Sequence, residues 1–350
     1  MDSSFLTTRK PWLPVAVSLF LLALLCATVI WQAHGFGRAM EQGRQHQFER
    51  MVDELEQGLR ERMRAYEITL RGLSGLLMAG EEVGPREWQR AADQLQVQTL
   101  YPGIQGVTWA PYVSAEELDG LVARMRQAGL ADFRIEPPGQ RPSYLVVAYV
   151  SPPDERNRRV IGYDLLSEPV RREAMVRARE SGQSTLSAPL RLRQEDGEDL
   201  QRGVLLNLPV YRPRTPRAPS EEQGLLGMVV GAFRMNDLLE AVLDDRADRL
   251  AVRLVDEQGG WLAGLDQKAV ETARYADERR IELYGRTWLL SVAATPAFDA
   301  ALASGVPLSL PLGLGLSILA SLSVGALLYL RERALFITEI GRASCRERVC

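Results

Sequence analysis

Two long uncharged stretches lie near the ends of the chain, and a region of mixed polarity lies between them. The first, Trp12–Gln32, holds about 20 consecutive mostly apolar residues, the length a helix needs to cross ~30 Å of hydrocarbon. The second, Val306–Leu330, is also uncharged and long enough to cross. We therefore expect transmembrane helices over residues 12–33 and 306–330. A cleavable signal peptide is the alternative for the first stretch, although its apolar core normally runs only ~7–15 residues.

Basic residues flank each stretch on the side nearer the chain terminus. Arg9 and Lys10 precede the first, and Arg331 and Arg333 follow the second. Loops rich in Lys and Arg stay in the cytoplasm, so residues 1–11 and 331–338 are expected there. The protein is then a multi-pass protein of the cell inner membrane whose middle region, from residue 34 to 305, is periplasmic.

Apolar and aromatic residues after the first span recur in steps of three or four. They are Phe48, Val52, Leu55, Leu59, Met63, Tyr66, Leu70 and Leu73. This near-heptad stripe predicts a long periplasmic helix over residues 34–79. The stripe can pack on its own domain, on a twin helix, or on both, and we expect a homodimer through this helix.

Shorter helices and alternating strands follow, punctuated by glycine and proline. Helices are expected over residues 86–98, 115–129, 169–181 and 235–244, and strands within 101–113, 144–150, 184–192, 203–211, 225–233, 250–255 and 280–292. The run 144–150 is expected as a central strand, and 212–223 as a solvated loop. For the helix 169–181, Ser167 is the candidate cap and Gly182 lies just past its end. The order predicts an α+β fold with antiparallel sheets and helices to one side.

The composition and net charge argue against one class of protein, and the positions of the cysteines argue against disulfides. Apolar residues make up 46% and charged residues 25% of the chain, and the net charge is -3, which argues against a nucleic-acid binder. Of the three cysteines, Cys26 lies in the first span and Cys345 and Cys350 lie at the end. The periplasmic region must therefore fold without disulfides.

Histidine is too scarce for the common catalytic and zinc sites. The two histidines, His34 and His46, lie beside the membrane and before the globular part. A histidine-based nucleophile system or a histidine zinc site in the exported domain is thereby excluded. The acidic run 194–199 is typical of a solvated loop rather than an acid/base pair. We expect no catalytic residues, no metal and no cofactor.

The last residues, 339–350, have no apolar period and no relation to the preceding span. They are similar to the translation of a sequencing-adapter read-through, so we expect the natural sequence to stop near Thr338. A charged juxtamembrane helix is the alternative.

Four sequence blocks occur in an order and spacing that resemble one known family. They are 157–167 (NRRVIGYDLLS), 177–182 (RARESG), 186–192 (LSAPLRL) and 208–211 (LPVY), and the segments 101–104 and 109–111 also fit. Together they resemble the CHASE family of extracellular sensory domains, found in histidine kinases and nucleotide cyclases, including the plant cytokinin receptors. The resemblance covers roughly residues 75–235.

The resemblance implies two tandem PAS-like domains behind a long helix. The membrane-distal, ligand-binding domain is expected over residues 80–225 and the membrane-proximal one over residues 226–305. In cytokinin-binding relatives the aspartate of the Gly-x-Asp position accepts hydrogen bonds from a purine-type ring, and here it is Asp164. A turn or helix cap is the alternative role for this residue. Leu186, with Ser187 beside it, corresponds to a leucine that makes backbone contacts, and Tyr144, Leu205 and Asn207 are further pocket candidates.

These expectations combine into a transmembrane signal receptor. A small molecule, purine-like or peptide-like, binds the distal PAS-like domain and shifts the balance between two packings. The signal then passes to a missing cytoplasmic histidine kinase of a two-component system, or to a diguanylate cyclase or phosphodiesterase of cyclic di-GMP signalling. The alternative is an extracytoplasmic partner-binding membrane protein that senses no small molecule.

Overall fold

The structure is a computed structural model that describes residues 12–79, 83–100, 102–195, 201–212, 224–264, 273–301 and 309–347. The expected cytoplasmic N-terminus and nearly all of the expected loop 212–223 lie outside these ranges. The chain forms two compact units. One consists of Met1–Gln47 with Leu302–Cys350, and the other of Phe48–Ala301.

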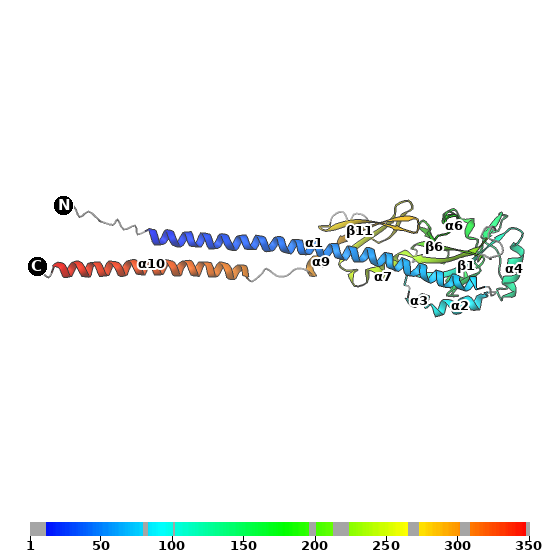
Figure 1. Ribbon diagram of the computed structural model, residues 1–350, viewed down its shortest axis with the longest axis horizontal. Coiled ribbons are helices and arrows are strands. Elements are labelled where there is room, and N and C mark those ends of the chain that lie inside the picture. Colours follow the sequence, from blue (N-terminus) through cyan, green and yellow to red (C-terminus); the bar gives the residue numbers. More distant parts are fainter. Residues whose placement is uncertain are drawn as a thin grey trace. The chain divides into compact units, whose positions relative to one another are not determined.

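The first unit contains the two apolar helices. Helix α1 (Leu13–Met78) begins in this unit and continues into the second, and α10 (Ser309–Glu347) belongs to the first (Figure 1). Both contain a segment long and apolar enough to cross a membrane, within Val15–Met78 and Pro311–Leu335. The helices pack closely where side chains are small, since the Ser321 hydroxyl donates to the Ser18 carbonyl at 2.7 Å.

The predicted stripe of α1 packs on its own domain. None of its eight residues is more than 1% exposed. Tyr66 stacks on Phe233 with ring centroids 4.7 Å apart, and its hydroxyl donates to the Pro102 carbonyl at 2.5 Å. The first of the two partners predicted for the stripe is therefore confirmed. The stripe itself is not available for a helix of a second copy.

The C-terminal part of α1 lies against a seven-stranded antiparallel sheet. Its strands are β1 (Ile104–Ser114), β2 (Ser143–Leu145), β3 (Tyr149–Ser151), β4 (Thr185–Leu186), β5 (Leu190–Arg191), β6 (Arg202–Tyr211) and β7 (Leu225–Arg234). The order is β2-β1-β7-β6-β4, with β3 paired to β1 and β5 to β6. Successive side chains of each strand point to opposite faces of this sheet. In β7, Phe233 meets α1, whereas Val230 and Ala232 join the core on the opposite face.

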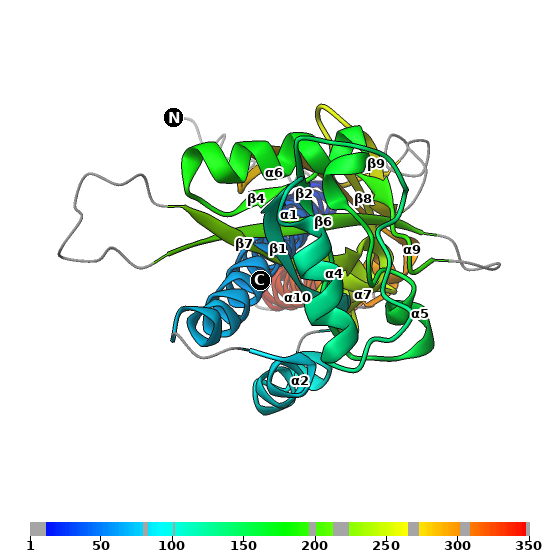
Figure 2. The same cartoon turned by 90° about the vertical axis from the view of Figure 1, so that its right-hand side faces the viewer.

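Helices cover both faces of this sheet. They are α2 (Pro85–Gln94), α3 (Val97–Leu100), α4 (Leu118–Gln127), α5 (Glu155–Arg158), the 3-10 turn η1 (Leu165–Ser167) and α6 (Pro169–Ser181). Figure 2 shows α6 and α2 on opposite sides of the strands. The core on the α6 side is apolar and includes Leu145, Met175, Leu205 and Met228.

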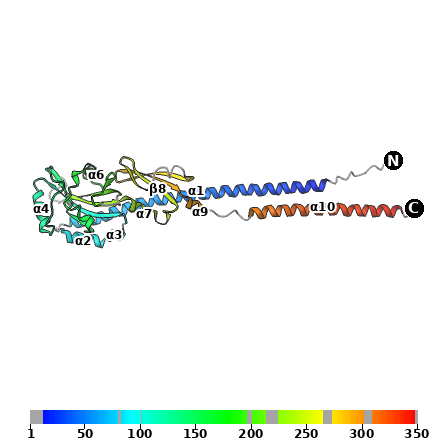
Figure 3. The same cartoon turned by 180° about the vertical axis from the view of Figure 1, so that it is seen from behind.

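A four-stranded antiparallel sheet packs along the middle of α1. It consists of β8 (Leu250–Asp256), β9 (Gly260–Gly264), β10 (Ala276–Leu283) and β11 (Arg286–Ala294), in the order β10-β11-β8-β9. Helix α7 (Met235–Leu243), η2 (Asp244–Arg246) and α9 (Pro296–Ala301) complete this part (Figure 3). Ion pairs Arg246–Glu54 and Arg279–Asp53 join it to α1. The predicted α+β class with two antiparallel sheets behind a long helix is confirmed.

Three expected features need correction. Residues 144–150 form two short strands beside β1 at the edge of the sheet, rather than one central strand. Between the two strands, the amides of Val146 and Ala148 still donate to β1, while Val147 exchanges hydrogen bonds with Gly162 and Tyr163. Strand β7 lies inside the first sheet, so the change of sheet falls after Arg234 and not at residue 225. Residues 280–292 are parts of a hairpin, since Tyr284 and Gly285 have φ of 47° and 78°, the conformation that a two-residue turn requires.

The helix predicted over residues 169–181 is confirmed to the residue, and Gly182 ends it with φ of 67°. Its cap is Glu168, not Ser167. The Glu168 carboxylate accepts from the amides of Val170 and Arg171, whereas the Ser167 hydroxyl donates to the Asp164 carbonyl at 2.6 Å.

Candidate ligand-binding site

The segment Gly162-Tyr163-Asp164 forms the wall of the seven-stranded domain that faces α6. It is fixed by its backbone: the Val147 amide donates to the Tyr163 carbonyl at 3.0 Å, and the Gly162 amide donates to the Val147 carbonyl at 2.8 Å. Gly162 has φ of 86°, and a Cβ at this position would lie 2.0 Å from the Arg134 carbonyl oxygen. Only glycine allows this approach.

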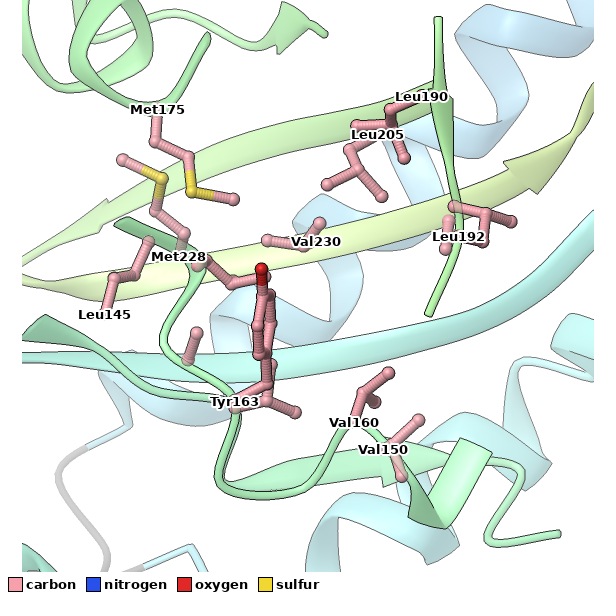
Figure 4. Close-up of a cluster of buried hydrophobic side chains, with 14 of the residues drawn as sticks. Leu145, Val150, Val160, Tyr163, Met175, Leu190, Leu192, Leu205, Met228 and Val230 are labelled. Carbon is pink, nitrogen blue, oxygen red and sulfur yellow. The ribbon is translucent and has the colours of Figure 1, made fainter. Parts of the chain in front are cut away.

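Tyr163 points from this segment into the core on the α6 side. Figure 4 shows its ring directed toward β7, with Val230 and Leu205 beyond it. It borders a small cavity of about 30 Å³. The cavity is lined by Thr108, Val147, Val160, Tyr163, Leu165, Arg171, Leu192, Arg193, Gln194, Leu205, Val230 and Ala232. Most of these side chains are apolar, and the polar ones include Thr108 of β1, Arg171 of α6, and Arg193 and Gln194 after β5.

Two guanidinium groups lie near the ring of Tyr163. Arg193 lies 4.3 Å and Arg171 5.4 Å from the ring centroid, distances at which a cation attracts the ring face. Arg171 is 7% exposed, and its Nη2 donates to the Arg191 carbonyl at 2.9 Å while Nη1 pairs with Glu168. Gln194 is also buried and borders the same space. The cavity thus joins an apolar interior to a planar ring and charged hydrogen-bond donors.

Asp164 points away from this cavity, because successive residues of an extended segment face opposite sides. Its side chain is fully buried. One carboxylate oxygen accepts from the amides of Leu145 and Leu166 at 3.0 Å each, and the other forms an ion pair with Arg141 at 2.7 Å. Asp164 is the cap of η1, which is the turn-capping alternative considered from the sequence.

Tyr144 lies with Asp164 rather than at the cavity. Its hydroxyl donates to the Gly139 carbonyl and accepts from the Arg141 amide, both at 2.9 Å. The Arg141 guanidinium lies 5.1 Å from the Tyr144 ring centroid. Tyr144, Arg141 and Asp164 therefore form one buried polar cluster, which ties residues 139–145 to the segment 162–164.

The remaining sequence-predicted residues lie between β4 and β6. The Ser187 hydroxyl accepts from the Leu205 amide and donates to the Ala188 carbonyl, both at 2.9 Å. The side-chain Nδ2 of Asn207 donates to the Thr185 carbonyl, and its buried Oδ1 has no hydrogen-bond partner within the described ranges. Of the six predicted ligand residues, Leu205 is the one that lines the cavity.

Leu186 connects the two sheets. Its amide donates to the Tyr284 carbonyl at 3.0 Å, and its own carbonyl accepts from Arg177 of α6 at 2.6 Å. Arg177 also donates to the Gly285 carbonyl at 3.0 Å. One side chain from α6 is therefore hydrogen-bonded to both β4 and the turn of the β10–β11 hairpin.

Glu67 of α1 lies at the same junction. Burial acts to raise the pKa of Glu67, but the hydrogen bond from Ser184 and the interactions with Arg71 outweigh it and lower the pKa. Burial, together with the charge of Glu67, raises the pKa of the neighbouring Tyr284. The carboxylate and the neutral phenol are thus both stable forms at neutral pH.

Sequence reasoning missed Tyr163, Arg171 and Gln194, although Tyr163 adjoins the residue it selected. The available signal was the alternation along 162–164, which places the tyrosine and the aspartate on opposite sides. Among the described residues no group of three or more His, Cys, Asp or Glu side chains could hold a metal ion.

Comparison with known families gives one match. The family model described as the CHASE domain matches residues 81–263, more than half of the chain. The match begins just before α2 and ends within β9, so it includes the whole seven-stranded sheet and the first two strands of the other sheet.

Several solved structures are similar to this chain at low identity. The periplasmic sensory domain of the Campylobacter jejuni chemoreceptor Tlp1 is 8% identical over 74% of this chain and 94% of that chain, with a TM-score of 0.44. The extracellular domain of the putative histidine kinase vpHK1S-Z8 is 11% identical over 82% and 97%, with a TM-score of 0.30. A domain of a putative sensory box/GGDEF family protein from Vibrio parahaemolyticus is 12% identical over 80% and 99%, with a TM-score of 0.30.

Proposed function

This chain belongs to the CHASE domain family, whose members are extracellular sensory domains of signalling proteins, and from that membership we propose that it is the ligand-sensing part of a transmembrane receptor. The periplasmic region binds a small molecule in the cavity beside Tyr163. The receptor works as a homodimer and passes the signal to a cytoplasmic histidine kinase or diguanylate cyclase. The chain itself carries no catalytic role in this proposal.

The observation that carries the proposal is the small, mostly apolar cavity on the α6 side of the sheet. Ligand sites are mostly apolar with a few polar groups that fix orientation, and this cavity has apolar walls with Tyr163, Arg171 and Gln194. Its volume of about 30 Å³ suits a molecule the size of water, whereas drug-sized ligands occupy roughly 300–1,000 Å³. Binding must therefore move the wall formed by residues 160–165 and 192–194 outward.

That movement supplies two states with different affinity for the ligand. A ligand shifts such an equilibrium only by its preference for one state, and couplings of this kind are ~1–3 kcal/mol. Because Arg171 and Arg177 lie on the same helix, a shift of α6 acts on Leu186 and on the β10–β11 turn together. The second sheet then transmits the change to the membrane helices.

A planar polar molecule fits the groups that face the cavity. The Tyr163 ring offers a stacking surface, and the guanidinium of Arg171 and the amide of Gln194 offer hydrogen bonds. We propose a purine-like or peptide-like compound. Asp164 then acts as a positioning residue, which holds Tyr163 in place through the bonds to Leu145, Leu166 and Arg141.

The ligand proposal is tested with the full chain in nanodiscs and a panel of purines and short peptides. We expect at least one compound to raise the unfolding temperature, since binding at 100 times Kd adds about 2.7 kcal/mol. Arg171→Met should remove this shift. Arg177→Gln should keep the shift but lose the ligand-induced change in hydrogen exchange of the turn at Tyr284. If no compound stabilises the protein, or if Arg171→Met keeps the full shift, the cavity is not the ligand site.

The membrane topology is a separate proposal, supported by the two candidate spans and by the arginines and lysine that flank them. Fusions of alkaline phosphatase and of green fluorescent protein after residue 200 and after residue 335 test it. We expect phosphatase activity only at residue 200 and fluorescence only at residue 335. Fluorescence at residue 200 would contradict the receptor proposal as a whole.

A further inference from the structure

A second, larger hollow lies on the outer side of the wall that encloses the cavity. This groove, between α2 and the segment from β3 to Ile161, has a volume of about 530 Å³. Its apolar part is formed by Leu130, Ala148, Tyr149, Val150, Pro153 and Ile161. Val147 and Val160 line the cavity, whereas Ala148 and Ile161, the next residue in each case, line the groove. The two hollows therefore share a wall but no lining residue.

The charged residues of the groove all have one sign. Arg86, Arg90 and Arg158 line it, and no carboxylate among the described residues does. Arg90 pairs with Glu87 at 2.6 Å, but Arg86 and Arg158 form no ion pair with any residue in the described ranges. Gln89, between the two α2 arginines, donates to Asp93, and its buried Oε1 accepts no hydrogen bond from the part of the chain that the structure describes.

We propose that this groove binds a small amphiphilic anion, a molecule with one carboxylate, sulfonate or phosphate group on an apolar body. The apolar body covers Tyr149, Val150 and Ile161, and the anionic group lies between Arg86 and Arg158. Arginine is suited to these groups because its planar donors match their oxygens two at a time. A hydroxyl or amide N–H on the ligand would satisfy the Gln89 oxygen.

The size of the groove favours a small molecule over a protein partner. Its volume lies in the range of roughly 300–1,000 Å³ that small-molecule sites occupy. A stable protein interface needs about 800 Å² from each partner, a flat area much larger than the mouth of a hollow of this volume.

The test uses three probes with the same body and different charge: para-trifluoromethyl benzoate, the corresponding neutral benzyl alcohol, and the cationic benzylamine. Fluorine NMR line broadening is measured with the full chain in nanodiscs of zwitterionic lipid, and empty nanodiscs serve as the blank. We expect the benzoate to bind at least about tenfold more tightly than the alcohol, and the amine not to bind. Equal broadening by all three probes would overturn the proposal.

Variants locate the bound anion. The double variant Arg86→Gln with Arg158→Gln should weaken benzoate binding at least about tenfold. Arg124→Gln, an exposed arginine on α4 outside the groove, should leave it unchanged. Circular dichroism of each variant verifies the fold. Retained binding in the double variant overturns the proposal, and so does loss in Arg171→Met alone, because the anion would then occupy the cavity and not the groove.

Discussion

Gly162→Ala should destabilise the periplasmic region by about 3 kcal/mol or more, because two effects act at one residue. A left-handed backbone costs an L-residue roughly 1–2 kcal/mol. In addition, the new Cβ would lie 2.0 Å from the Arg134 carbonyl oxygen, so the backbone of one segment must move. Urea unfolding of the full chain, followed by the near-ultraviolet signal of the periplasmic tryptophans, measures the change.

Gly75→Ala is the matched control for this substitution. Gly75 is an exposed glycine within α1, and a Cβ there meets nothing within 4 Å. Alanine in a helix interior is favoured over glycine by about 0.8–1.0 kcal/mol, so this variant should be slightly more stable than the parent. If Gly162→Ala unfolds at the same urea concentration as Gly75→Ala, the segment 162–164 is not held as the structure indicates.

Features fixed by neighbouring residues could be predicted from the sequence. The helix 169–181 has a proline in its first turn and a glycine after its last residue, and both signals act within a few residues. The stripe of α1 was equally clear, since eight apolar positions repeat in steps of three or four. Its partner could not be decided, because a twin helix and a sheet bury such a stripe equally well. The structure assigns it to the protein's own sheets.

Features fixed by distant residues could not be predicted. Residues 144–150 are apolar throughout, as in a central strand, but they lie at the edge of the sheet, where Val147 exchanges hydrogen bonds with Gly162 and Tyr163. The register that places Tyr163 in the core depends on this contact between segments about 16 residues apart. Similarly, the second sheet has four strands where the sequence predicted two, because β9 is short and because the run 280–292 contains the turn at Tyr284 and Gly285.

The candidate site also combines features that the sequence predicts with features that depend on distant residues. A resemblance between sequences identifies a motif but does not say which of its side chains faces a cavity. Asp164 was predicted as a ligand contact because it occupies the Gly-x-Asp position of the resemblance. In the structure its carboxylate is bound by two amides and one guanidinium. Tyr163 lines the cavity. The sequence therefore points to a motif, and the three-dimensional contacts distinguish the side chain that lines the cavity from the one that is bound within the domain.

Asp164→Ala should destabilise the domain by about 3–5 kcal/mol and should also remove ligand-induced stabilisation. Removal of one partner from a buried ion pair leaves the other charge uncompensated, and losses of this size are typical. Here the Leu145 and Leu166 amides lose their acceptor as well. The measurements are urea unfolding of the full chain and calorimetric titration of the stabilising compound.

Arg141→Gln separates the two roles that Asp164 can have. It removes the ion pair but leaves the carboxylate and its two amide bonds in place. If Asp164 acts by holding Tyr163, both Arg141→Gln and Asp164→Asn should weaken ligand binding. In each variant the loss of affinity should then follow the loss of stability. If instead Asp164 touches the ligand directly, Asp164→Asn should reduce affinity far more than its loss of stability explains, while Arg141→Gln should not. The buried position of the carboxylate, away from the cavity, leads us to expect the first result.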